Sequence, residues 1–277
     1  MARDNVVIQF APIAANYWYP FMDAEHNADT RDALMGWMAV SKRFFIWDYR
    51  QDFNDIIFPF PYQRNAQENI ETYVEIGAME VFQQAQRFCP GSPFVDMENF
   101  ALSRLHWNYK ENFDELCDEF RKAYYQEAEP AVSEYLQAIH TFWDTLRDER
   151  GHTGHLYWTP SRRPEANRLG DLDHFRDILD RGLAAAQSIV DPDRRKKIYD
   201  RVNILTLYHK IARLFCFPFS DSRENMLRLL EDVRCITSEH GVNYYCFWNP
   251  MKELLDECEG VLTGSIPLDQ RRCQRIR

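Results

Sequence analysis

The chain has 277 residues, of which 45% are hydrophobic and 27% are charged, a balance typical of a globular protein with a substantial core. Its 33 basic and 43 acidic side chains give a formal net charge of -10, which argues against a nucleic-acid partner. No apolar run approaches the roughly 20 residues that span a bilayer, and the start lacks a signal-peptide hydrophobic region. We therefore expect a cytoplasmic chain with no membrane span.

Three short apolar runs in the first third of the chain predict β-strands. They cover Val6–Ile13, Arg43–Tyr49 and Ala78–Gln83. Helical spacing of apolar side chains predicts one helix in each interval between them, at Asp29–Val40 and Asn65–Glu75. This β-α-β-α-β alternation predicts an α/β architecture, a parallel sheet with right-handed crossovers.

The strand signals stop at about residue 95, and helices are predicted after it. They are Asp96–Leu105, Asn112–Tyr125, Pro130–Arg147, Leu172–Ile189, a helix that Asp191 and Pro192 open and that runs to about Phe215, and Ser222–His240. Residues 151–170 form the best candidate for a loop. We expect an α/β segment over residues 1–95, an all-α domain over 96–259 that contains this loop, and a loose tail over 260–277.

Aromatic residues make up 14% of the chain. Most are expected in the core, including Trp107, Tyr124 and Tyr125 in predicted helices, but Trp and Tyr rings can also stack on sugars. The 7 Cys form no Cys-x-x-Cys pair, so we expect free thiols and no zinc knuckle. His152 and His155 lack a third ligand at a suitable spacing, so we predict no metal and no cofactor.

Six segments of the chain occur in an order that points to a known family. They are Ile46–Tyr49, Phe58–Pro61, Gly77–Gln84, Leu105–Asn108, Glu119–Tyr125 and Ala128–Tyr135. As an ordered set, they make the chain resemble the bacterial family named domain of unknown function 4838, from about Asn5 to Tyr135. Members of this family typically form the C-terminal part of larger proteins related to α-glucuronidases and other barrel glycosidases.

The resemblance implies that residues 1–95 supply the last three parallel strands of a TIM-like (β/α) barrel and that a C-terminal helical domain follows. A closed barrel of this kind takes about 250 residues, and three strands alone leave two open sheet edges. We therefore expect an N-terminal barrel half that this sequence lacks, or a partner chain, to complete the sheet. Full-length relatives could then be secreted.

Asp48 is the candidate catalytic residue, because it ends a predicted strand, where barrel enzymes place catalytic groups. Its aromatic neighbours Trp47 and Tyr49 would raise its pKa and suit it to acid/base chemistry. Glycoside hydrolysis ordinarily needs two carboxyl groups, but the third strand ends in Gln83 and Gln84, which cannot transfer a proton. Asp48 thus has no evident partner, and a structural role in the following loop is the alternative.

A glycan-binding surface is predicted at the carboxyl ends of the strands. Its candidate residues are Asn16, Tyr17, Trp18, Trp47, Tyr49, Gln83 and Gln84, with Asp52 and Asn54 as weaker candidates. Trp and Tyr rings would stack on a sugar while the amides bond its hydroxyl groups. For residues 16–18, packing within the loop is the alternative.

Three hypotheses about function stay open. The chain is a glycoside-hydrolase-related fragment that binds, or once processed, a uronic-acid or similar glycan. Alternatively, it is a non-catalytic helical module whose strands pair with the sheet of a partner. The third hypothesis is a truncated gene product with little activity. In each case we predict that this chain alone does not hydrolyse aryl glycosides or glucuronides.

Overall fold

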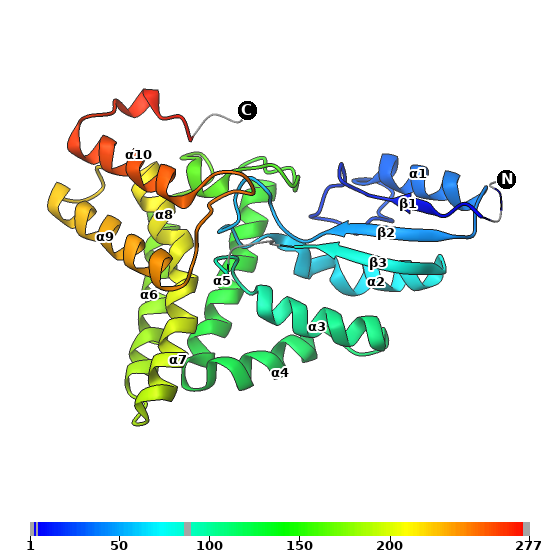
Figure 1. The fold of residues 1–277 in the computed structure, drawn as a ribbon, viewed down its shortest axis with the longest axis horizontal. Helices are drawn as coiled ribbons and strands as arrows, with labels where there is room; N and C mark the ends of the chain where they lie inside the picture. Colours follow the sequence, from blue (N-terminus) through cyan, green and yellow to red (C-terminus); the bar gives the residue numbers. More distant parts are fainter. Residues whose placement is uncertain (1–2, 4, 86–89, 274–277) are drawn as a thin grey trace.

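The computed structural model describes residues 3, 5–85 and 90–273 and shows a small sheet on one side of a larger set of helices (Figure 1). The sheet region contains β1 (Ile8–Phe10), α1 (Ala28–Met38), β2 (Phe44–Tyr49), α2 (Ala66–Glu75) and β3 (Ala78–Gln84). The strands are parallel and lie in the order β1-β2-β3. The predicted α/β segment followed by helices is confirmed, whereas its interpretation as a barrel fragment stays a prediction.

The two faces of the sheet differ in what covers them. Phe44, Ile46 and Asp48 alternate along β2 and are buried on the face that packs against α2. Phe45 and Trp47 point to the opposite face and are only partly buried there. Parallel sheets are normally covered on both faces, so an open aromatic face is an unusual feature of this fold.

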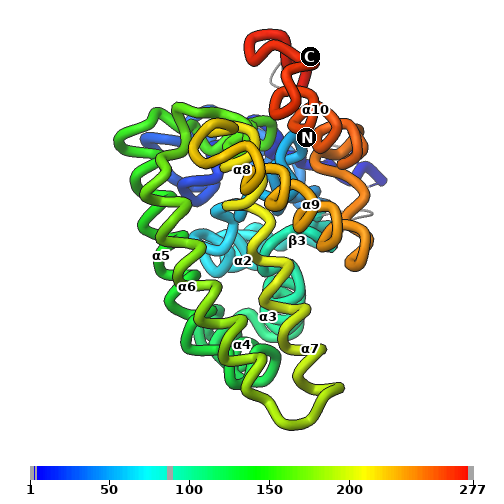
Figure 2. Tube along the Cα trace, turned by 90° about the vertical axis from the view of Figure 1, so that its left-hand side faces the viewer, coloured from blue at the N-terminus to red at the C-terminus, as the bar shows by residue number. Residues whose placement is uncertain are grey.

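Eight α-helices follow the sheet in the described part of the chain. They are α3 (Val95–Trp107), α4 (Phe113–Tyr125), α5 (Glu129–Asp148), α6 (Leu169–Gln187), α7 (Pro192–Asn203), α8 (Leu207–Cys216), α9 (Arg223–Glu239) and α10 (Met251–Thr263). Helices α5, α6 and α7 run side by side, with α4 at their lower end (Figure 2). No described helix is both long enough and apolar enough to cross a membrane.

One hydrophobic core connects the sheet with the helices. Ile46 of β2, Leu105 of α3 and Trp143 of α5 belong to the same cluster of buried side chains. A second cluster joins α8, α9 and α10 and includes Ile57, which follows β2 in the sequence. The division at residues 95 and 96 stays a prediction, but side-chain packing crosses it.

Two predicted boundaries differ in the structure. Strand β1 is much shorter than Val6–Ile13, because Pro12 has no amide hydrogen for a strand ladder and the amide of Ile13 bonds Ala11 O in a tight turn. In the tail that we expected to be loose, residues 263–270 are mostly exposed, whereas Arg271 and Cys273 are buried. There the Arg271 guanidinium donates to Phe215 O and the Cys273 amide donates to the Glu257 carboxylate, at 2.9 Å.

Two features of the helical region were also missed. Helix α10 was not predicted, although Leu254, Leu255 and Cys258 have helical spacing and are buried. We expected Trp107 in the core, but its side chain is 91% exposed. Helix α3 ends at this residue. Tyr125 is buried, as predicted.

Candidate functional site

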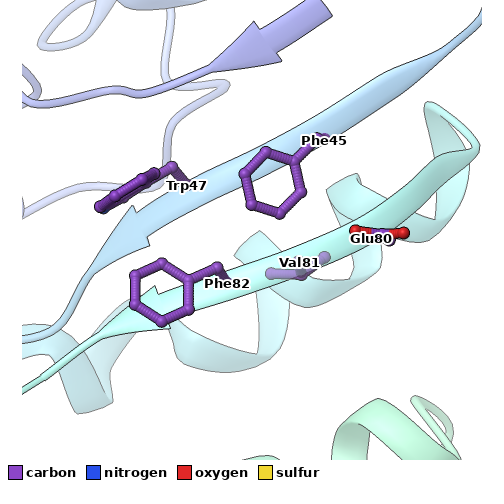
Figure 3. Close-up of a pocket in the computed structure, with 5 residues that line it drawn as sticks. All are labelled: Phe45, Trp47, Glu80, Val81 and Phe82. Carbon is purple, nitrogen blue, oxygen red and sulfur yellow. The ribbon is translucent and has the colours of Figure 1, made fainter. Parts of the chain in front are cut away.

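The open face of the sheet carries a group of aromatic side chains near the carboxyl ends of β2 and β3 (Figure 3). Trp47 and Phe82 lie opposite each other in the strand register and meet edge to face, with 4.9 Å between ring centroids. With Phe45, Glu80 and Val81 they line a shallow depression of about 700 Å³. We call these five residues the open-face depression.

An irregularity in β3 determines which side chains reach this face. Phe44 lies opposite Ala78, but Phe45 lies opposite Glu80, so β3 contains one extra residue at Met79. Such a bulge shifts the alternation of the strand that contains it. As a result, Glu80 and Phe82 share the open face with Phe45 and Trp47.

Two polar groups accompany the rings on the open face. The indole N–H of Trp47 donates to Gln84 Oε1 at 2.8 Å, which fixes the orientation of the ring. Glu80 is exposed, and no basic side chain among the described residues lies within ion-pair distance of it. The face therefore combines flat apolar surface with an amide and a free carboxylate.

Asp48 lies behind the sheet, on the face that α2 covers. Its Oδ2 accepts hydrogen bonds from the Tyr62 hydroxyl at 2.7 Å and from Gln83 Nε2 at 3.2 Å, and its Oδ1 accepts from the Tyr49 amide at 2.7 Å. Burial raises the pKa of Asp48, and the hydrogen bonds from Tyr62 and Gln83 oppose that rise. Gln83 Oε1 in turn lies 2.9 Å from His106 Nε2, on the exposed side of α3.

These contacts bear on the predicted role of Asp48. The carboxylate is fully buried, and alternation along β2 separates it from the open face to which Trp47 points. Its partners give it a structural role, in which it holds Gln83 and Tyr62 at the end of the sheet. The catalytic role stays a prediction, and the expected rise of its pKa comes from burial.

The predicted binding residues separate into three regions, which are the open face, the covered side of the sheet and the loop after β1. Trp47 and Gln84 meet on the open face, whereas Gln83 bonds Asp48 behind the sheet. Tyr49 is buried and packs edge to face on Phe53, with 5.8 Å between ring centroids. Of these residues, Trp47 and Gln84 lie toward the carboxyl ends of the strands on an accessible face, and the binding role of all of them stays a prediction.

The loop after β1 forms the third region. Tyr17 and Trp18 are buried, and the Trp18 indole donates to His152 O at 2.9 Å. Asn16 and Trp18 border a separate depression of about 560 Å³, with His26 and Arg147 on its wall. Tyr17 packs in the core, and this loop does not share the open-face depression.

The sequence did not identify two buried acids, Glu98 and Asp55. Glu98 accepts from Gln63 Nε2 at 3.0 Å and lies 3.9 Å from Arg50, and burial raises its pKa to about 7. The weaker candidate Asp52 lies near Asp55, whose pKa burial raises to about 6. No sequence pattern indicates that these acids are buried, because the segments that cover them lie far away in the sequence. The loop of residues 151–170 is one such segment, and its Ser161 bonds Asp55.

The described residues contain no group of three His, Cys, Asp or Glu side chains that could hold a metal ion. The six cysteines in the described part of the chain are free thiols, and Cys89 lies outside it. The candidate site thus consists of aromatic, amide and carboxylate groups.

The fold and the site together describe a class of protein. It has a parallel β/α unit with one open aromatic face, and helices follow this unit in the chain. Residues 1–137 match the model of the family described as Domain of unknown function (DUF4838), and this part of the chain belongs to that family. No curated protein and no solved structure matched the chain. The resemblance to this family is therefore confirmed, while the link to α-glucuronidases stays a hypothesis.

Proposed function

We propose that the chain is the glycan-binding, C-terminal portion of a glycoside-hydrolase-like protein and that it is not catalytic alone. The observation that carries this proposal is the accessible pair of rings, the partly buried Trp47 and the exposed Phe82, beside the Gln84 amide and the Glu80 carboxylate. Aromatic rings stack on the C–H faces of sugars, and amides and carboxylates bond their hydroxyl groups. This combination supports carbohydrate as the ligand class.

We also propose that the three strands belong to a TIM-like barrel. In a TIM-like barrel the open face would turn toward the barrel axis, and the carboxyl ends of β2 and β3 would form part of the rim of the site. The partly exposed rings of this face support that arrangement, because parallel sheets are normally covered on both faces. Further β/α units, from a longer chain or from a partner chain, would cover the rest of it.

Catalysis by this chain alone is not part of the proposal, because hydrolysis of a glycoside needs two carboxyl groups flanking the bond. The open-face depression contains one carboxylate, that of Glu80. Asp48 is bonded on the other face of the sheet. We therefore expect binding without turnover.

Calorimetric titration with a panel of oligosaccharides tests the proposal. Trp47→Ala removes the ring that Gln84 orients, so affinity should fall by about tenfold or more. Trp107→Ala is the matched control, since its exposed ring lies at the end of α3, and it should bind as the wild type does. Trp248 is a second exposed ring outside the depression. Failure to bind any glycan, or loss of binding in Trp107→Ala or Trp248→Ala but not in Trp47→Ala, contradicts the proposal.

A second candidate function is association through the open face. Phe82 and Met79 of β3 are 44% and 54% exposed, which favours a protein surface as cover. Light scattering during size-exclusion chromatography tests this candidate over a range of concentrations. A dimer that Phe82→Glu converts to a monomer would support association, and a monomer at all concentrations excludes self-association.

A further inference from the structure

The open-face depression has one charge, and that charge is negative. Glu80 lies among Phe45, Trp47, Val81 and Phe82, which offer it no counter-charge. Among the residues that the structure describes, no Lys or Arg lines the depression. Arg43, two residues before Phe45, is the nearest arginine by strand position, and it does not line the depression. Arg50, just beyond the other end of β2, is bound behind the sheet by Asn99 at 2.7 Å and by Glu98.

The net charge of the whole chain is negative, like the charge of Glu80. The chain has a formal net charge of -10, so its overall field repels polyanions before they reach any surface. At contact the repulsion becomes local, because the aromatic walls around Glu80 replace part of the water that would screen it. An anionic sugar placed on Trp47 or Phe82 would therefore face an unpaired carboxylate.

Neutral and amino sugars are not repelled by the Glu80 carboxylate. A carboxylate accepts hydrogen bonds from vicinal hydroxyl groups without any change of charge. A sugar ammonium group would form a stronger, charge-assisted bond with Glu80 and would also be attracted to the face of the Trp47 ring. The same carboxylate thus discriminates among glycans by their charge.

We infer that the open-face depression selects neutral or amino sugars and rejects uronates. This inference rests on the proposed glycan-binding function and gives it a substrate class. It replaces the uronic-acid glycan that the family resemblance suggested, because Glu80 occupies the position where a uronate would need a cation. Glu80 is then the specificity-determining residue of this surface.

Three oligosaccharides of equal length, composed of glucose, glucosamine or glucuronate, test the inference by calorimetry at low ionic strength. We expect the wild type to bind the glucosamine oligomer most tightly and the glucuronate oligomer about tenfold more weakly than the glucose oligomer. Added salt should reduce these differences, because it screens the carboxylate.

Glu80→Gln keeps the shape of the side chain and removes its charge. It should bring the affinities for the three oligomers close together while it still binds the glucose oligomer. Glu75→Gln is the control, because this exposed carboxylate lies at the end of α2, outside the depression, and it should leave the order of affinities unchanged.

The possible results distinguish a failure of the charge selectivity from a failure of glycan binding itself. Glucuronate bound as tightly as glucose by the wild type, or an order of affinities that Glu80→Gln does not change, overturns the inference and leaves glycan binding intact. Absence of binding to all three oligomers contradicts the proposed function and the inference together.

Discussion

At the residue scale, Glu98 links protonation to folding. It is buried beside Arg50 and Gln63, and its pKa rises from 4.5 to about 7 because burial outweighs both partners. The folded protein therefore holds one more proton than the unfolded chain between these two pH values. The free energy of unfolding contributed by Glu98 then falls as the pH rises through this range.

Glu98→Gln should remove that pH dependence. Relative to the wild type, the variant should gain stability as the pH rises from 4.5 to 7, by about 3 kcal/mol in total for a shift of this size. Urea denaturation followed by circular dichroism at several pH values measures this difference. A constant difference between the two proteins across this range would show that Glu98 is not protonated on folding.

Asp48 illustrates what a sequence can and cannot predict about a single residue. Its place at the end of β2 followed from the apolar run around it, and the alternation of a strand requires that Asp48 and Trp47 face opposite sides. Which side the helices cover could not be predicted, because it depends on where Tyr62 and Tyr73 pack. The donors that surround its carboxylate come from residues as distant as Gln83.

At the scale of elements, local signals predicted most helices and strands. Asp191 caps α7 through a hydrogen bond from the Arg194 amide at 2.7 Å, as the Asp-Pro pair indicated. The bulge at Met79 left no mark in the sequence, although it places Glu80 on the open face. It arises from the pairing of β2 with β3, a contact that no single segment encodes.

Gly154 connects two loops that lie far apart in the sequence. Its φ is +66°, and an added Cβ would clash with Asn16 and Trp18 in the loop after β1. Gly151 has a nearly equal φ of +67° but open space around it. Alanine substitutions at the two glycines therefore distinguish the stability lost through backbone strain from the stability lost through a steric clash.

Gly154→Ala should destabilise the fold by about 2 to 4 kcal/mol, because backbone strain adds to the clash. Gly151→Ala should cost about 1 kcal/mol, from the left-handed conformation alone. Chemical denaturation of both variants gives the comparison. Equal losses of stability would mean that the loop around Gly154 moves away from Asn16 without cost.

At the scale of the whole molecule, the continuous core predicts cooperative unfolding. The cluster that contains Ile46 of β2 also contains Trp143 of α5 and Ile178 of α6. Elements that share a core lose their stability together. Thermal unfolding should therefore show one transition, with the same midpoint by far-UV circular dichroism and by tryptophan fluorescence. Two separate midpoints would indicate that the sheet region and the helices fold as independent units.

We propose that a glycan binds on the open face of the sheet, beside Trp47. Nuclear magnetic resonance of the indole N–H groups of the 7 Trp tests it most directly, with Trp47→Phe to assign its signal. On addition of a glucose or glucosamine oligomer, we expect the Trp47 signal to shift, because its N–H bonds Gln84 beside the ligand, while the Trp107 and Trp248 signals stay in place. A ligand that shifts Trp107 or Trp248 and leaves Trp47 unchanged would contradict the claim.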